Sequence, residues 1–361
     1  MENGIDAFLP PESGMKKLIT EYLLFVTDLQ LVAENARHDP KRNGRFGRIA
    51  TGLGLALNEQ KGGWMAPAVM QFLKAWERDV RNETVACRSE IVEKVVSIWG
   101  KCRTDQPDAH TAQTNRILIL PLVNLWCFLT FSMDTLSMMR QMLRNIDNLQ
   151  LPLQEYAEKD VAIWRYYKGR FLFLEGYARE AATELGYTWQ HAPTKLAPKI
   201  APYLTASRLL MGILPTPLGL ISPDPAFRAC MEPLVQAFRY GNLKLWRDTL
   251  ARHALWLIRW AGYTWLMARG TPVVWRNLIR RIWLLSRDVA RSPNQLETKY
   301  VYAAATWLEE DIVSIEEAEH VIMNLIDQGF IKGYLHMDKH ILVLGKEDPF
   351  PKLKDIAYAA Y

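Results

Sequence analysis

The residues best suited to bind a charged partner are arginines and lysines that gather in one part of the chain. From Lys244 to Ser292 the sequence holds ten Lys or Arg and two Asp or Glu, a local charge of +8, whereas the whole chain carries +5. The rest of the chain is therefore slightly acidic. At about 100° per residue, a helix over 273–291 places four arginines within about 60° of arc. These are Arg276, Arg280, Arg287 and Arg291.

This arginine face has a simple alternative explanation, the solvated side of an amphipathic helix, because its opposite side is apolar. The apolar side carries Trp275, Leu278, Ile279, Ile282, Leu285 and Val289. Solvation does not explain why nearly every charge is positive, whereas an acidic partner does. We predict nucleic-acid contacts at Arg276, Arg280 and Arg281. We predict protein contacts at Trp275, Arg287 and Arg291.

The sequence contains no arrangement of side chains that is typical of catalysis. The phosphate-binding loop, nucleophile elbow, zinc-protease and calcium-loop motifs are absent. His336 and His340 are four residues apart, but they fall in an expected hairpin with no cysteine or carboxylate arranged around them. Gly52-Leu53-Gly54 begins like a dinucleotide fingerprint, but no third glycine follows. We therefore predict a non-enzymatic protein that needs no cofactor and no metal.

The N-terminal part of the chain is expected to be helical. Apolar residues at steps of three and four predict a helix over 16–36, and six glycines predict a loop from His38 to Gly63. Helical patterns return over Trp64–Gly100 and Thr114–Leu149. The most hydrophobic stretch, Ile117–Phe131, is short for a membrane span and contains a proline, so we expect a buried helix.

The middle of the chain resembles an irregular stack of helix pairs. From Asp160, aromatic residues followed by Gly169, Ala178 and Ala181 predict two antiparallel helices in close contact, a loose match to a tetratricopeptide unit. Seven prolines break the region 193–225, and helices return over 225–291. No strand pattern occurs before the last sixty-five residues, so we predict a predominantly all-α fold.

The C-terminal region has the layout of a winged helix. We expect a helix from Leu296 to Glu309 and a second helix that Ser314 and Glu317 begin as a capping box. Two β-prone runs, 330–335 and 341–344, then predict a hairpin, with the sheet confined to about 330–345. The order helix, helix, hairpin predicts a winged helix.

The presumed recognition helix of this module is acidic on its exposed side, with Glu316, Glu317, Glu319 and Asp327. These negative charges repel phosphates, so we do not expect this helix to read bases in the major groove of DNA. Nucleic acid is expected to contact the wing and tail through Lys332, Lys339 and Lys346, which position a backbone without reading sequence. Glu316 and Glu319 are predicted to face a basic surface of a partner protein.

The composition fits a folded protein of a reducing compartment. The chain has 361 residues, of which 49% are hydrophobic, and four cysteines without a CxxC pair. The first eleven residues lack the basic and apolar regions of a signal peptide.

Three segments together resemble the PCI-domain family, and in particular the branch that contains an mRNA-export subunit of the TREX-two complex (Thp type) and its signalosome-associated sibling. They are the residues from Val274 to Trp283, from Asn324 to Tyr334 and from Asp348 to Pro351. The resemblance covers about the C-terminal two-thirds of the chain. It implies a helical-repeat part over 151–295 and a winged helix with its tail over 296–361. Residues 1–150 lie outside the resemblance, and only their helical patterns predict a helical region there.

The resemblance also implies a function as a scaffold in mRNA export. The expected partners are a larger PCI protein of the GANP/Sac class, a small acidic disordered protein of the Sem/DSS class, and RNA or DNA bound weakly and without sequence preference. The expected location is the nucleus, at nuclear pores, with the cytoplasm as the alternative. The sequence leaves open a protein-only subunit of a signalosome-like or splicing-associated complex.

Overall fold

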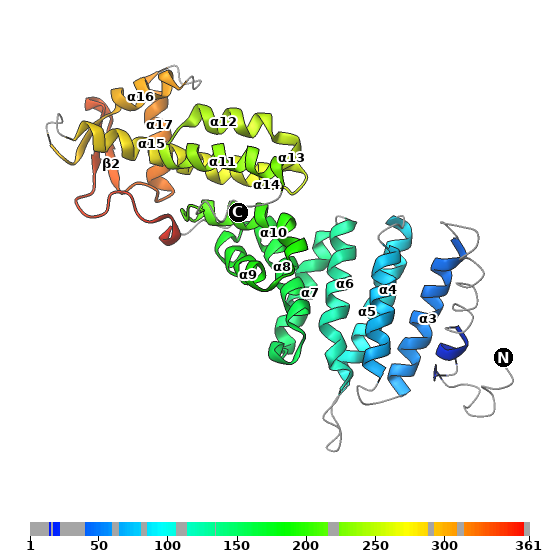
Figure 1. Ribbon diagram of the computed structural model, residues 1–361. Coiled ribbons are helices and arrows are strands. Elements are labelled where there is room, and N and C mark those ends of the chain that lie inside the picture. Colours follow the sequence, from blue (N-terminus) through cyan, green and yellow to red (C-terminus); the bar gives the residue numbers. More distant parts are fainter. Residues whose placement is uncertain are drawn as a thin grey trace. The chain divides into compact units, whose positions relative to one another are not determined.

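The computed structural model describes residues 14–15, 17–21, 40–59, 65–80, 85–105, 114–133, 135–215, 224–287, 292–308 and 314–356. The chain divides into two compact units, residues 1–167 and 168–361. More than half of its residues lie in α-helices, which confirms the predicted all-α class (Figure 1).

The first unit is a stack of helices around a strongly apolar one. Its elements are α3 (Pro40–Glu59), α4 (Ala66–Val80), α5 (Val85–Thr104), η2 (Asn115–Leu118), α6 (Ile119–Ser132), α7 (Leu136–Leu149) and the first turns of α8 (Glu158–Leu174), which continues into the second unit. α5 packs against both α3 and α6. The segment Asn115–Ser132 is long and apolar enough to cross a membrane, but two thirds of it is buried inside the structure. The predicted buried helix is therefore confirmed.

The predicted loop from His38 to Gly63 is wrong, because residues 40–59 form α3. A Cβ atom on Gly52 would lie 3.1 Å from the Leu18 backbone, so glycine allows this neighbouring segment to approach closely. Lys101 Nζ donates to the Gly54 carbonyl at 2.7 Å. These tertiary contacts stabilise a helix that its glycines disfavour by about 1 kcal/mol each. Of the helix predicted over 16–36, residues 17–21 are helical and the rest lies outside the described residues.

The second unit begins with helical pairs. After the end of α8 come α9 (Ala178–His191), α10 (Ala197–Leu210), α11 (Pro225–Tyr240), α12 (Leu243–Arg252), α13 (Ala254–Ile258), α14 (Gly262–Trp265), the π-helical turn η6 (Leu266–Gly270) and α15 (Thr271–Ser286). α9 packs on α10, and α11 packs on both α12 and α15. A Cβ atom on Gly169 would lie 2.7 Å from the Leu185 side chain, which confirms the predicted close approach of α8 and α9.

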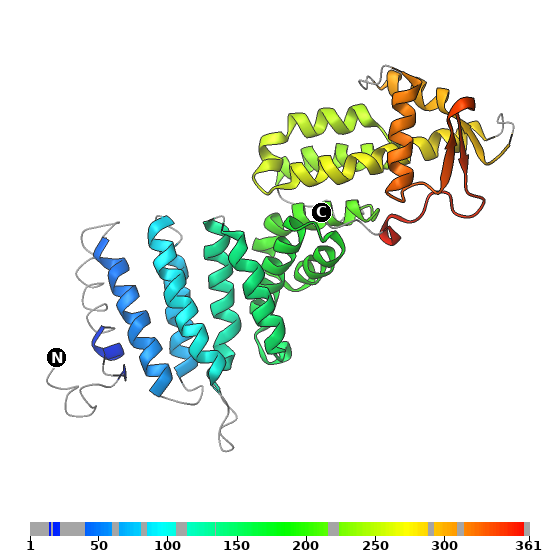
Figure 2. The same ribbon diagram turned by 180° about the vertical axis from the view of Figure 1, so that it is seen from behind.

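The winged helix follows α15 and contains a three-stranded antiparallel sheet (Figure 2). Its elements are β1 (Gln295–Glu297), α16 (Thr298–Trp307), α17 (Ile315–Asp327), β2 (Gly333–His336), η7 (Met337–Lys339) and β3 (Ile341–Leu344), with strand order β1-β3-β2. The Ser314 hydroxyl accepts the Glu317 N–H, as the predicted cap requires.

The sheet is larger than the sequence predicted, because β1 joins it outside 330–345. Leu296, expected to begin a helix, is fully buried in β1 and pairs with Leu342. A strand of three residues is too short to show the alternation that marks a strand in sequence.

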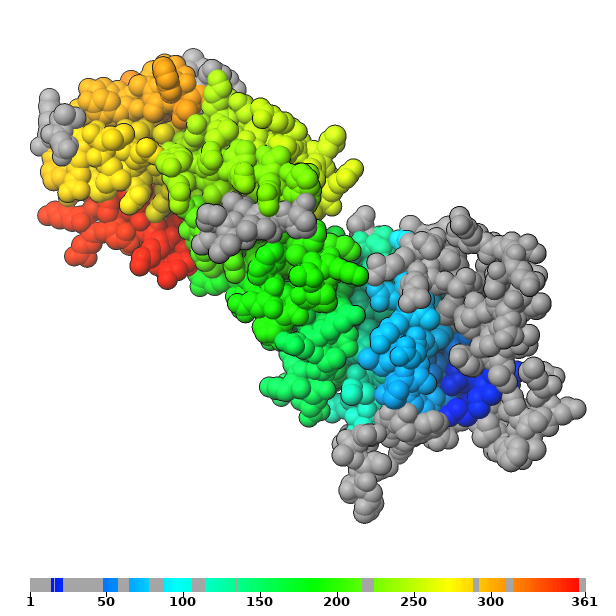
Figure 3. All heavy atoms as spheres, in the orientation of Figure 1, coloured from blue at the N-terminus to red at the C-terminus, as the bar shows by residue number. Residues whose placement is uncertain are grey.

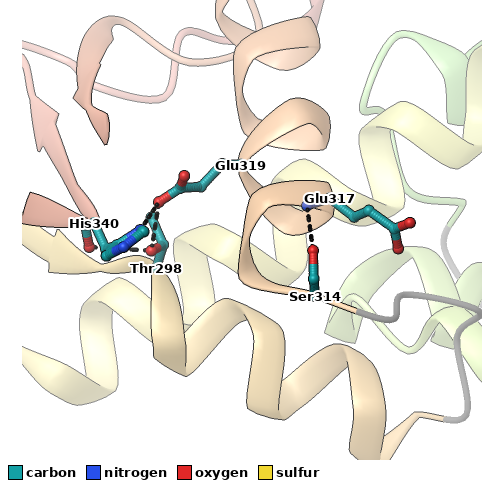
Figure 4. A network of polar contacts seen from close by, with 5 residues as sticks. All are labelled: Thr298, Ser314, Glu317, Glu319 and His340. Carbon is teal, nitrogen blue, oxygen red and sulfur yellow. Dashed lines mark hydrogen bonds and ion pairs between the residues drawn. The ribbon is translucent and has the colours of Figure 1, made fainter. Parts of the chain in front are cut away.

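Glu319 is buried, so its predicted place on the exposed acidic face is wrong. Its Oε1 accepts a hydrogen bond from the Thr298 hydroxyl at 2.9 Å and lies 3.0 Å from His340 Nδ1 (Figure 4). The Thr298 N–H also donates to the His340 carbonyl at 2.9 Å. This network joins α16, α17 and the turn before β3, and it gives the buried carboxylate polar partners.

Glu319→Ala is expected to destabilise the protein by about 3 kcal/mol, since it removes the acceptor of the buried Thr298 hydroxyl and leaves a cavity. Thermal and denaturant unfolding measure the loss. Asp327→Asn, an exposed change on the same helix, is the control and should alter stability by less than about 0.5 kcal/mol. Equal stabilities of the two variants would contradict the structural importance of the network.

Candidate partner-binding groove

A hollow of about 680 Å³ lies in the second unit between the ends of α10 and α11, helix α15 and the C-terminal residues. We call it the basic groove. Figure 3 shows the C-terminal residues, in red, beside the yellow of α15 and the green of α10. Its lining comprises Met211, Gly212, Ile213, Leu214, Phe238, Arg239, Arg276, Asn277, Arg280, Arg281, Leu284, Leu285, Lys352, Leu353 and Lys354.

The turn after α11 brings Arg239 to the arginines of α15. Gly241 closes this turn with φ +70°, and a Cβ atom there would lie 2.4 Å from the Leu278 backbone nitrogen. Asn277 Nδ2 donates to the Phe238 carbonyl at 2.7 Å, and the Arg281 guanidinium lies 5.1 Å from the centre of the Tyr240 ring. The close approach of turn and helix thus fixes one wall of the groove.

The charged side chains that line the groove are all positive. Its exposed charged side chains are those of Arg239, Arg280, Arg281, Lys352 and Lys354, and none of the described residues in its lining is acidic. Five positive charges around one hollow attract an acidic ligand.

The groove also exposes apolar side chains. Ile213 is 46% exposed, Leu284 43% and Leu285 76%. Leu285 was expected on the buried side of its helix, and its exposure corrects that expectation. Apolar side chains beside arginines and lysines suit a polypeptide ligand that has both acidic and apolar residues. A phosphate backbone suits them less well, because it has no apolar group to bury against leucine.

Arg276 does not lie on the exposed arginine face where the sequence placed it. It is 7% exposed, and its Nη2 donates to the carbonyl oxygens of Phe350 at 2.9 Å and Pro351 at 2.7 Å. Its Nη1 donates to Asn277 Oδ1 at 2.8 Å. The predicted contact of this guanidinium with phosphates is therefore replaced by contacts with the protein's own backbone. Arg280 and Arg281, one turn further on, are exposed as predicted.

The residues predicted to bind a protein partner differ in accessibility. Trp275, predicted to contact a protein partner, is buried and belongs to the core around α15. Arg287 is exposed and lies over the Trp283 ring, 5.7 Å from its centre. Arg291 lies outside the described residues.

The predicted contacts of the winged helix form a second surface. Lys332, Lys339 and Lys346 are exposed on the wing and its flanks, and none of them lines the basic groove. Glu316 is exposed at the start of α17, and its hydrogen bond to Ser314 lowers the pKa of its carboxyl group. The exposed acidic face of α17 therefore consists of Glu316, Glu317 and Asp327, without Glu319.

The described residues offer little nucleophilic or metal-binding chemistry. No group of three His, Cys, Asp or Glu among them could hold a metal ion. Burial raises the pKa of the Cys102 and Cys230 thiols to about 12 and that of Cys127 well above its usual value. These three thiols are protonated at neutral pH, and a thiol is a poor nucleophile.

Sequence reasoning missed Arg239 and the exposed leucines as members of one site. Tyr240-Gly241-Asn242 is a recognisable helix ending, so the turn itself could have been found. The meeting of this turn with α15, 35 or more residues later, depends on tertiary packing that leaves no local pattern.

Comparison with known proteins gives consistent relatives, although no family model matches the chain. A PCI domain-containing protein of Schizosaccharomyces pombe is 26% identical, with 93% of this chain and 80% of the relative aligned. PCI domain-containing protein 2 of Xenopus laevis is 26% identical over 74% of this chain and 66% of its own length. A protein CSN12 homolog of Mycosarcoma maydis is 30% identical over 63% of this chain.

The alignment with the Mycosarcoma maydis relative spans about half of that protein, 53% of its length. These similarities support the PCI-domain family for this chain, in the group whose members are named PCI domain-containing protein 2 and CSN12 homolog.

Proposed function

We propose that this chain is a non-enzymatic scaffold subunit of a nuclear mRNA-export assembly of the TREX-two type. In this role it holds a larger PCI protein of the GANP/Sac class and a small acidic protein of the Sem/DSS class, and contributes to RNA or DNA binding. Similarity to proteins named PCI domain-containing protein 2 supports the family branch. The observation that carries the proposal is the basic groove, which has five exposed arginine and lysine side chains, exposed leucines and no acidic residue in its described lining.

The basic groove is the proposed seat of the small acidic protein. Acidic groups of that protein pair with Arg280, Arg281 and Arg239, while its apolar side chains cover Leu284 and Leu285. Charge-assisted hydrogen bonds to arginine supply strength and orientation, and burial of leucine adds about 25 cal/mol per Å² of apolar surface.

The winged helix is the proposed seat of the other two partners. Its acidic α17 face suits a basic surface of the larger PCI protein. The lysines of the wing contact phosphates without reading bases, because the acidic α17 keeps nucleic acid away from the position of a recognition helix.

A protein-only subunit of a signalosome-like or splicing-associated complex is the second candidate. The acidic face of α17 and the relative named CSN12 homolog favour it. The two candidates differ in RNA binding by the assembled complex.

Reversing two charges in the groove with Arg280→Glu and Arg281→Glu is expected to abolish capture of the acidic protein, because both side chains are exposed in the groove and the substituted carboxylates repel an acidic ligand. The double change Lys195→Glu with Lys199→Glu alters the charge equally on exposed positions outside the groove, and should leave capture intact. Capture is measured by pull-down with purified acidic protein. If both double variants capture it equally, the groove is not its seat.

Reversing the α17 face with Glu316→Lys and Glu317→Lys is expected to slow association with the larger PCI protein by about tenfold at low salt. Biosensor kinetics at several salt concentrations measure the rate. Association that is indifferent to both substitution and salt would place the contact on another surface.

The isolated chain is expected to bind single-stranded RNA weakly, at the weak end of about 10⁻⁴ to 10⁻⁶ M at physiological salt. Lys332→Ala, Lys339→Ala and Arg281→Ala should each lower the affinity for all RNA sequences alike. Each should also reduce the slope of log affinity against log salt concentration by about one. Fluorescence anisotropy at several salt concentrations provides both values. Absence of RNA binding by the assembled complex would favour the protein-only candidate.

A further inference from the structure

One wall of the basic groove is a segment with little regular structure. We call residues 349–356 the C-terminal strap. Lys352, Leu353 and Lys354 of the strap face the groove, while Pro349 and Ile356 lie at its ends. Without the strap, the groove would lose two of its five exposed basic side chains and the apolar side chain of Leu353.

Two arginines from different helices hold the strap. Arg276 of α15 donates to the Phe350 and Pro351 carbonyls, and Arg179 of α9 donates to the Lys354 carbonyl. The strap makes a turn of its own over 352–356, and the Lys332 N–H donates to the Pro349 carbonyl where it begins. Arginine side chains therefore donate to strap carbonyls that would accept from backbone N–H groups if the strap were a helix or a strand.

Apolar anchors complete the docking of the strap. Phe350, Leu353 and Ile356 are all buried, and the Phe350 ring lies 5.7 Å from the Trp283 ring. Leu353 packs on Gly212, where a Cβ atom would lie 2.9 Å from the Leu353 side chain. The anchors fix which strap residues face the groove.

Electrostatics oppose this docking. Lys352 and Lys354 lie in the same hollow as Arg239, Arg280 and Arg281. The acidic residues of the neighbouring sequence, Glu347, Asp348 and Asp355, are exposed and do not line it. Repulsion between the strap and α15 is therefore relieved by salt or by an acidic ligand.

We propose that Arg179 and Arg276 are positioning residues that hold the C-terminal strap closed, and that strap docking and binding of an acidic, apolar-containing segment in the basic groove are coupled. This inference rests on the groove of the proposed function. Because coupling is reciprocal, a ligand that needs the closed strap also stabilises it. Raising salt should therefore slow strap opening in the free chain, where repulsion is screened.

The test follows two readouts in the full chain. Amide hydrogen exchange of residues 350–356 reports strap opening, and fluorescence anisotropy reports binding of a fluorescein-labelled synthetic peptide that alternates aspartate with leucine and tryptophan. Arg179→Gln is the main variant, because Arg179 is exposed on α9 and does not line the groove. Arg228→Gln, an equal charge change on an exposed position of α11, is the matched control.

Arg179→Gln is expected to speed exchange of the strap amides at least tenfold and to weaken the peptide at least threefold, whereas Arg228→Gln changes neither. Saturating peptide should slow strap exchange in the unsubstituted chain. The double variant Lys352→Ala with Lys354→Ala should lose peptide affinity while its strap exchanges no faster than in the unsubstituted chain. Arg276→Lys, which keeps a long, positively charged donor, should retain more strap protection than Arg276→Gln.

Three results would overturn the inference in different ways. Fast strap exchange with unchanged peptide affinity in Arg179→Gln would show that the groove works without the strap. Unchanged strap exchange in both Arg179→Gln and Arg276→Gln would show that other contacts hold the strap. An unsubstituted chain that does not bind the peptide, with strap exchange still sensitive to Arg179→Gln, would refute the coupling and the acidic-partner groove while leaving the positioning role.

Discussion

The guanidinium of Arg276 is a positive charge taken out of water, and its desolvation costs several kcal/mol unless hydrogen bonds compensate it. The carbonyls of Phe350 and Pro351 have the complementary need, because they are buried in a segment that belongs to neither helix nor sheet. One contact satisfies both groups. It also places the Phe350 ring 5.7 Å from the Arg276 guanidinium and beside Trp283, so the polar contact and the apolar packing stabilise the same arrangement.

Helix α15 serves two parts of the second unit at once. It packs on α11 and α12 of the helical pairs and contacts β1 and α16 of the winged helix. Arg276 at its centre is buried, whereas Arg280 and Arg281, one turn later, are exposed and line the basic groove. The groove is bounded by this helix, by the ends of α10 and α11 and by the C-terminal residues that Arg276 holds.

Local patterns in the sequence predicted the elements whose signals are themselves local. Ser314 caps α17 and the hairpin lies where the β-prone runs placed it, because caps and turns depend on residues a few positions apart. Arg276 and Glu319 were misplaced for the opposite reason. Helical periodicity shows which side of a helix is polar, but it does not show that a carbonyl 74 residues away, or a threonine and a histidine 21 residues away, will cover that side. Helix α3 was missed because its glycines meet neighbouring segments that the sequence does not place.

The winged helix carries exposed charges of both signs, and this bears on how its surfaces act together in the proposed assembly. The exposed carboxylates of α17 belong to the same small module as Lys332 and Lys339, so they weaken the attraction of the wing for phosphate at low ionic strength. A partner that covers Glu316 and Glu317 with basic groups removes this opposing charge and adds its own. Under the proposed function, the gain in phosphate affinity then comes from a change in the electrostatic field around the wing lysines, and we expect the chain to bind nucleic acid well only after it has bound the protein partner.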